Sequence, residues 1–133
     1  MIGADGSQIM IDHGLLVGTR GFGNDLLASE VSQSAALIHN LGTGVTTRLM
    51  TLIDGDDQAV THAFKCSIAP GGLDPVTIGT TPVAARTVTE ECNGVLGHFY
   101  NYYWVVPASG EIIQSSQWAS PLTGKISLRV TQR

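Results

Sequence analysis

The stretch from Val95 to Val106 constrains the fold most strongly, because it holds five of the chain's eight aromatic residues. Side chains of an extended strand alternate between two faces, and neither face of this stretch is polar. A strand that is apolar on both sides is usually central and covered twice, by its own domain or by a neighbouring subunit. One face would carry Leu96, His98, Tyr100, Tyr102, Trp104 and Val106, and the other Val95, Phe99, Tyr103 and Val105.

Short alternating stretches separated by turn residues follow residue 42, a pattern typical of antiparallel β structure. An acidic turn at Asp54–Asp57 predicts a hairpin, and Asn93–Gly94 predicts a tight turn before the aromatic stretch. Residues 115–124 are polar and predict a loop. The expected strands are 14–17, 45–53, 59–69, 76–78, 83–90, 95–106, 111–114 and 125–132.

One helix is expected over residues 25–41, where apolar side chains recur at helical spacing. Asn24 or Asp25 would cap its start, and Gly42 would end it in a left-handed conformation. The recurring apolar residues are Leu27, Val31, Ala35, Ile38 and Leu41.

Together these elements predict a mainly β fold with one helix. We expect a single β-sandwich or jelly-roll-like domain of six to eight short, mostly antiparallel strands, with the 25–41 helix packed against it. The length supports one core and therefore one domain, residues 1–133. Within it, residues 1–12 would form an extended arm or edge strand, and residues 45–132 the β-rich body.

Charged residues make up 14% of the chain, against about a quarter in a typical soluble protein. Such a surface favours association with other subunits over life as a free monomer. The net charge of −4 and the scattered Lys and Arg residues argue against binding to nucleic acid. No apolar run approaches the ~20 residues that span a bilayer, and no basic leader is seen, so we expect neither membrane insertion nor a secretory signal.

Cys66 and Cys92 are the two cysteines of the chain, and their spacing matches no metal-binding or redox motif. A single pair in a chain of this length does not define a disulfide scaffold. Buried free thiols are the preferred prediction, and a disulfide is the alternative if the two strands that carry the cysteines meet.

A glycine-rich turn at Gly18–Asn24 follows a strand and precedes the expected helix. Free N–H groups at the helix start would favour a phosphate there, and Arg20 would add a positive charge. The stretch Leu15–Leu26 resembles the nucleotide-binding loop of the short-chain dehydrogenases, which implies a nucleotide-binding enzyme. Its glycine spacing departs from that family's pattern, and the chain lacks the alternating strands and helices of a dinucleotide fold. Glycines that permit a tight connection are the preferred interpretation.

Other reactive side chains form no convincing site. Asp54–Asp57 offers oxygen ligands for calcium, but the later ligands of a calcium loop are absent, and a solvated turn is preferred. No two histidines are spaced four apart for zinc, and His62 and His98 are expected to be hydrogen-bonded core residues. Glu90 and Glu91 are adjacent, so in a strand they would face opposite ways. We predict no catalytic residue, no cofactor and no metal.

These features favour a non-enzymatic structural subunit that assembles into a larger particle or filament, most simply a phage head, decoration or tail protein. Its location would be a virion or extracellular assembly, and its partners copies of itself and other structural subunits. Neighbours would cover its apolar faces. The candidate interface residues are Phe99, Tyr100, Tyr102, Tyr103, Trp104 and Trp118.

Two other functions stay open. Aromatic strands also offer stacking surfaces, so a small carbohydrate- or surface-ligand-binding module would use Tyr100, Tyr102, Trp104 and Trp118. A nucleotide-binding enzyme that uses Gly18–Asn24 is the more remote alternative.

Overall fold

The computed structural model describes residues 6–131, which form eleven strands and one helix. The predicted mainly β, largely antiparallel fold with one helix is confirmed. The helix, α1, spans Ser32–His39. The strands are β1 (Gln8–Asp12), β2 (Leu15–Arg20), β3 (Leu26–Glu30), β4 (Gly44–Ile53), β5 (Ala59–Leu73), β6 (Val76–Ile78), β7 (Thr81–Val83), β8 (Arg86–Gly94), β9 (Gly97–Val105), β10 (Ile112–Ser120) and β11 (Gly124–Arg129).

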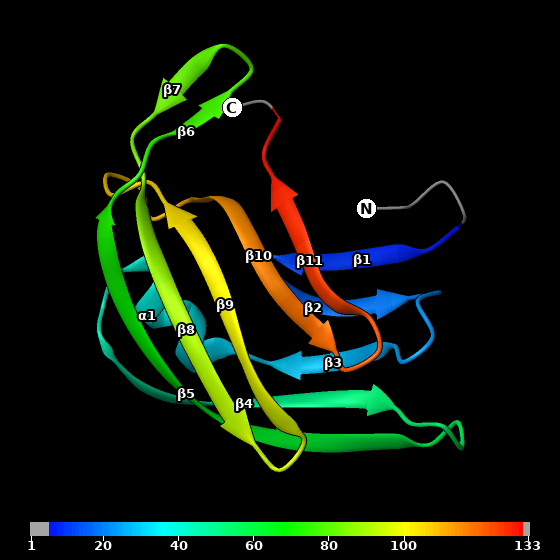
Figure 1. The fold of residues 1–133 in the computed structure, drawn as a ribbon. Coiled ribbons are helices and arrows are strands. Elements are labelled where there is room, and N and C mark those ends of the chain that lie inside the picture. The colour runs from blue at the N-terminus through cyan, green and yellow to red at the C-terminus, as the bar shows by residue number, and fades with distance from the viewer. Residues whose placement is uncertain (1–5, 132–133) are drawn as a thin grey trace.

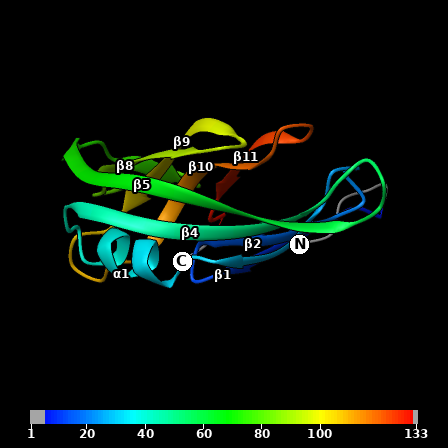
Figure 2. The same ribbon diagram turned by 90° about the horizontal axis from the view of Figure 1, so that it is seen from below.

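Seven strands form one antiparallel sheet in the order β11-β10-β9-β8-β5-β4-β3. The sheet curls, so that β3 and β4 lie in a second layer opposite β9, β10 and β11 (Figures 1 and 2). The β1–β2 hairpin extends this second layer, because β2 contacts both β3 and β10. The small β6–β7 hairpin projects from one end of the sheet (Figure 1). One curled sheet therefore produces a sandwich-like arrangement.

The core lies between the two layers, and α1 covers one end of it through contacts with β4, β5 and β9. We call the core side of the sheet its inner face and the opposite side its outer face. The predicted alternation of β5 is confirmed, because Phe64, Cys66 and Ile68 are buried while the residues between them are exposed. Burial of these inner side chains provides the main driving force for closing the layers.

The predicted helix over residues 25–41 is wrong in its first third. Residues 26–30 form β3 instead, because Leu26 is fully buried opposite Leu52 and the strand covers the edge that β4 would otherwise expose. The helix ends near Asn40, and Leu41 rather than Gly42 adopts the left-handed conformation, with a φ of 54°. Tertiary pairing has overridden local helix spacing at this point.

Turn predictions at the two ends of the sheet had different outcomes. Asp54–Asp57 does form the hairpin turn between β4 and β5, where the Asp54 carboxylate accepts hydrogen bonds from two backbone N–H groups of the turn. Asn93 and Gly94 instead remain in β8, and the turn falls at Val95 and Leu96, between the paired glycines 94 and 97. The aromatic strand therefore begins later than predicted.

Residues 115–120 belong to β10, so the predicted polar loop at 115–124 is wrong over most of its length. Gln117 explains why polar residues are tolerated there. Its buried amide accepts a hydrogen bond from the Leu16 backbone and donates to the Gly14 carbonyl and to Ser115. Burial of a polar side chain costs little when its hydrogen bonds are satisfied. The predicted edge strand within residues 1–12 is present as β1, and residues 1–5 lie outside the described part.

Cys66 and Cys92 form a disulfide, which corrects the preference for free thiols. The two residues are directly paired across β5 and β8, and both are fully buried. The two cysteines are 26 residues apart in sequence, so their contact could not be inferred from spacing and depends on the register of the two strands.

Candidate functional site

The outer face of β9 carries four half-exposed rings, His98, Tyr100, Tyr102 and Trp104, which we call the aromatic row. The strand alternates, so the residues between them point inward and are buried. The predicted division of the aromatic strand into two faces is confirmed. Within the described residues this chain buries the inner face, and on the outer face it packs an apolar cluster that includes Val76 and Ile78 against Trp104. All four rings remain partly exposed, so the row is available to a ligand or to another molecule.

Neighbouring rings of the row contact one another. The centroids of Tyr100 and Tyr102 are 6.1 Å apart, and their planes differ by only 10°. His98 meets Tyr100 edge to face at 4.8 Å. Trp104 donates its indole N–H to the Asp74 carboxylate at 2.9 Å. Mutual packing restricts the rotamers of these side chains and keeps the row extended along the strand.

Glu91 on β8 holds one end of the aromatic row. Its Oε2 lies 2.8 Å from Nε2 of His98 and accepts a hydrogen bond of 3.2 Å from the Tyr100 hydroxyl. The hydrogen bond with His98 lowers the pKa of Glu91 below its ordinary value of 4.5, and the Tyr100 hydroxyl acts in the same direction. The negative charge of Glu91 raises the pKa of Tyr100 in turn. Glu91 is therefore an ionised, half-exposed acceptor at neutral pH.

Two cations flank the other end of the row. The Lys125 ammonium lies 4.7 Å from the centroid of the Tyr102 ring, a cation–π contact. Arg129 donates from Nε to the amide oxygen of Gln114 at 2.6 Å. Both cations come from β11, and strand register aligns Arg129 with Gln114 and Trp104.

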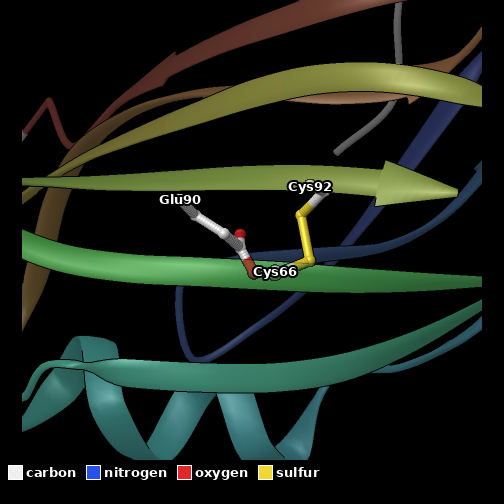
Figure 3. A group of neighbouring side chains, drawn as sticks. All are labelled: Cys66, Glu90 and Cys92. Atoms are coloured by element: carbon white, nitrogen blue, oxygen red, sulfur yellow. A yellow bond between two sulfur atoms is a disulfide. The ribbon is translucent and has the colours of Figure 1, made fainter.

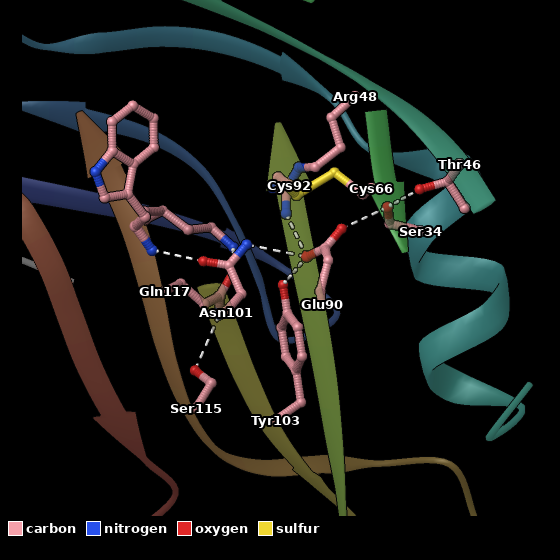
Figure 4. A network of polar contacts seen from close by, with 12 residues as sticks. Ser34, Thr46, Arg48, Cys66, Glu90, Cys92, Asn101, Tyr103, Ser115 and Gln117 are labelled. Carbon is pink, nitrogen blue, oxygen red and sulfur yellow. Dashed lines mark hydrogen bonds and ion pairs between the residues drawn. A yellow bond between two sulfur atoms is a disulfide. The ribbon is translucent and has the colours of Figure 1, made fainter. Parts of the chain in front are cut away.

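Behind the aromatic row, the inner face carries a fully buried ion pair between Arg48 of β4 and Glu90 of β8, with Nη1 and Oε1 2.7 Å apart (Figure 4). The same Oε1 accepts hydrogen bonds of 2.9 Å from Asn101 and from the Tyr103 hydroxyl. Ser34 of α1 donates to Oε2 at 2.6 Å. A carboxylate that is removed from water is stable only with such a set of donors.

Electrostatics within this network keep Arg48 charged. Burial, the largest single effect, would lower the pKa of Arg48, but the charge of Glu90 together with the interactions with Tyr103 outweighs it, and the pKa is raised. Burial, and then the charge of Glu90, raise the pKa of Tyr103, so its hydroxyl stays a donor. Because Asn101 and Tyr103 alternate with the aromatic row on β9, the network also fixes the register that turns those rings outward.

The carboxylate of Glu90 also lies beside the disulfide, with its oxygen and both sulfur atoms within 4.8 Å of one another (Figure 3). These are atoms of the kind that ligate metals. Both sulfurs are bonded to each other and Glu90 is paired with Arg48, so the arrangement is accounted for without an ion.

The structure divides the predicted interface residues between the two faces. Tyr100, Tyr102 and Trp104 lie in the outer row. Phe99 and Tyr103 belong to the core, and Trp118 stacks on Phe99 with ring centroids 4.3 Å apart. Phe99 and Tyr103 are buried within the chain, whereas Trp118 is half-buried and keeps part of its surface exposed.

The structure also tests several predictions about single residues. His98 was expected in the core but lies on the outer face beside Glu91. Glu90 and Glu91 do face opposite ways. The Gly18–Asn24 stretch leads into β3, so no helix start exists there to bind a phosphate, and Asp25 accepts hydrogen bonds from the backbone of Gly21 and its neighbour instead of capping a helix.

Sequence reasoning missed the network around Glu90. A usable indication was present, because Arg48 and Glu90 each lie on the inner face of a strand beside an apolar residue, Met50 in β4 and Val88 in β8. Opposite charges at two such positions indicate a buried pair.

Comparisons with known proteins place the chain in a family. Residues 1–130 match the family described as Group 4 capsule polysaccharide lipoprotein gfcB, YjbF. Among solved structures, the hypothetical lipoprotein YmcC from Escherichia coli (K12) is similar, with a TM-score of 0.80 and 20% identity over 96% of this chain and 72% of that chain. At this identity the likeness shows the fold alone. No curated protein matches the chain in sequence.

These matches overturn the prediction of a phage head, decoration or tail protein. A lipoprotein family conflicts with a virion location and with the expectation that the protein lacks a secretory signal. Neither name refers to an enzymatic activity. Within residues 6–131, no helix has the length and apolar character needed to cross a membrane. This chain belongs to the Group 4 capsule polysaccharide lipoprotein family.

Proposed function

We propose that this protein binds polysaccharide along the aromatic row and acts as a non-enzymatic component of capsule polysaccharide assembly at the cell surface. The observation that carries the proposal is the half-exposed row on β9, in a chain whose family is described by a capsule polysaccharide. Sugar rings have faces lined with C–H groups that pack on aromatic rings, and edges with hydroxyls that need hydrogen-bond partners.

The layout of the row fits an extended polymer better than a single sugar. Tyr100, Tyr102 and Trp104 follow one another at every second residue of β9, so their rings continue along the strand. The near-parallel planes of the two tyrosines give neighbouring sugars similar surfaces.

Polar groups suited to sugar hydroxyls border each ring. Strand register places Tyr102 between Thr89 of β8 and Ser116 of β10, and it places Trp104 between Thr87 and Gln114. These neighbours are all half-buried and face outward. Together with Glu91 they supply donors and acceptors beside an apolar platform, the combination that small polar ligands require.

The buried Cys66–Cys92 disulfide supports an exported location. Disulfides form and persist in oxidising compartments and at cell surfaces, and they are rare in the cytosol. A cell-surface role in capsule assembly therefore agrees with the cysteine chemistry.

The adjacent carboxylates Glu90 and Glu91 support a role in binding rather than hydrolysis. Glycoside hydrolysis uses two carboxyl groups on either side of one bond. Glu90 is buried against Arg48 and Glu91 lies on the opposite face, so these adjacent residues do not act on one bond together.

Binding is tested with capsular polysaccharide purified from the organism that encodes the chain, by calorimetry and by tryptophan fluorescence. We expect Tyr100→Ala, Tyr102→Ala and Trp104→Ala each to weaken binding about fivefold to tenfold, from the loss of one stacking contact. Saccharide should also change the emission of the wild type through Trp104, and Trp104→Phe should lose that change, since the remaining tryptophan, Trp118, is half-buried and stacked on Phe99.

A matched control is Leu49→Ala, which removes an exposed apolar side chain from the outer-facing side of β4. This variant should bind as the wild type does. Failure of the wild type to bind the polysaccharide, or unchanged binding by all three ring variants, would refute the proposed function.

Association with copies of itself or with other assembly subunits is a second proposal. It is favoured by Val45 and Leu49, which are 64% and 39% exposed on the same side of β4. Light scattering at micromolar concentration should give a mass well above 14.0 kDa, whereas a monomer at all concentrations would rule out self-association.

A further inference from the structure

We propose that the polysaccharide is acidic, with sugar carboxylates held by Lys125 and Arg129 beside the aromatic row; this inference rests on the proposed function. The site would then have a direction, with its anion-binding end along β11 and its neutral end at Glu91. The inference follows from where charges lie on the outer face and which of them are already paired.

Lys125 is the first cation of this end. Its ammonium lies 4.7 Å from the Tyr102 centroid, so its charge sits where a sugar packed on that ring would pass. Ser116, the β10 residue beside Tyr102, is small and neutral. None of the ion pairs among residues 6–131 includes Lys125. An ammonium without a carboxylate partner can exchange its ring contact for an anionic group of the ligand.

Arg129 repeats this arrangement four residues along β11. Strand register aligns Arg129 with Gln114 and Trp104. Each cation is therefore associated with one ring of the row, Lys125 with Tyr102 and Arg129 with Trp104. Its Nε is bonded to the neutral amide of Gln114, and no ion pair of the described residues involves it. A guanidinium oriented in this way retains N–H groups that match the two oxygens of a carboxylate.

The surroundings of these two cations contain no competing anions from their own strands. Residues 112–133 include no Asp or Glu, although the whole chain has a net charge of −4. The charged side chains of β10 and β11 are therefore both cations, and the nearby Asp74 carboxylate accepts the indole N–H of Trp104. Cations beside the platform would bind the carboxylates of uronic acids more strongly than the hydroxyls of neutral sugars.

Glu91 makes the opposite end of the row unsuitable for an anion. It is ionised and accepts hydrogen bonds from His98 and Tyr100. A carboxylate there would repel a sugar carboxylate but accept a hydrogen bond from a neutral hydroxyl. Anionic and neutral sugars therefore occupy different ends of the row.

The test compares native capsular polysaccharide with the same material after chemical reduction of its carboxylates to alcohols. We expect Lys125→Gln and Arg129→Gln each to weaken binding of the native form about threefold to fivefold, the range for exposed ion pairs. Carboxyl reduction should weaken binding to the wild type by a similar factor for each ion pair that it removes. Higher salt should weaken binding of the native polysaccharide but not of the reduced one. Binding of reduced material should not respond to either substitution.

The matched control is Lys65→Gln, which removes the same charge from the outward-facing side of β5, in the register row of Asn93 and His98. It should leave binding of the native form unchanged. If the wild type binds native and reduced polysaccharide equally, or if the polysaccharide that binds carries no carboxylate, the acidic-ligand inference fails while the proposed function stands. If neither form binds, the proposed function itself fails.

Discussion

Replacement of Arg48 by Met tests the physical reasoning about the core most directly. Arg48 and Glu90 are 1% and 0% exposed, and the substitution leaves the Glu90 carboxylate buried with only neutral donors. Loss of one partner of a buried pair costs about 3–5 kcal/mol. Total stability for a domain of this size is about 5–15 kcal/mol, so the variant should fold but unfold much more easily.

The second half of the cycle is Glu90→Gln. The amide that replaces the carboxylate would retain an oxygen for the donors of Asn101 and Tyr103 but would leave the Arg48 charge unpaired, so we again expect a cost of about 3–5 kcal/mol. The double variant buries no charge at this position. Its destabilisation should therefore be smaller than the sum of the two single values by at least ~2 kcal/mol.

Urea denaturation followed by circular dichroism, with the disulfide intact, gives the free energy of unfolding for each variant. Arg20→Met is the control, since it makes the same substitution at an exposed position and should change stability by less than about 0.5 kcal/mol. A cost below about 1 kcal/mol for Arg48→Met, or strict additivity in the double variant, would refute the view that the pair is desolvated and coupled.

Three further perturbations test other parts of the structure. Replacement of Cys66 and Cys92 by Ala should lower the free energy of unfolding by about 3.5 kcal/mol, the loop-closure value for their 26-residue separation, and a change below about 1 kcal/mol would contradict it. In a carbon-detected NMR titration the carboxyl of Glu91 should have its midpoint below 4.5, so its stabilising contact is present at neutral pH and is lost as the pH falls through that midpoint. His98→Phe should raise this midpoint, and an unchanged value would show that the contact is absent in solution. Asp57→Gly should raise the midpoint of thermal unfolding slightly, with a gain of up to ~1 kcal/mol, because Asp57 has a φ of 57°; a clear loss would mean that its side chain matters more than its backbone.

Alternation within single strands was predictable from the sequence, and it located much of the candidate site. The two faces of β9 and the buried set of β5 follow directly from period-two spacing, because neighbouring side chains of a strand must point in opposite directions. The opposite orientations of Glu90 and Glu91 follow for the same reason. These inferences need only local geometry, so no knowledge of strand order was required.

The function class was not predictable in the same way. Low charge and an aromatic strand are compatible with any protein whose surface is covered by a partner or a ligand. They led to the prediction of a virion subunit, whereas the family is that of a capsule polysaccharide lipoprotein. Polysaccharide binding was only an alternative, because sequence spacing could not show that Tyr100 and Tyr102 stay half-exposed on the outer face or that Trp118 stacks on Phe99.

The sequence by itself determined that this chain is mainly β, with one helix and an aromatic strand that divides its rings between two faces. Only the tertiary structure decided that residues 26–30 pair with β4, that Cys66 meets Cys92, and that Arg48, Glu90 and Ser34 converge in the core. The physical reason is that strand order and register join residues far apart in the chain. The interactions between such residues form only once the sheet has closed, so they cannot be inferred from local spacing.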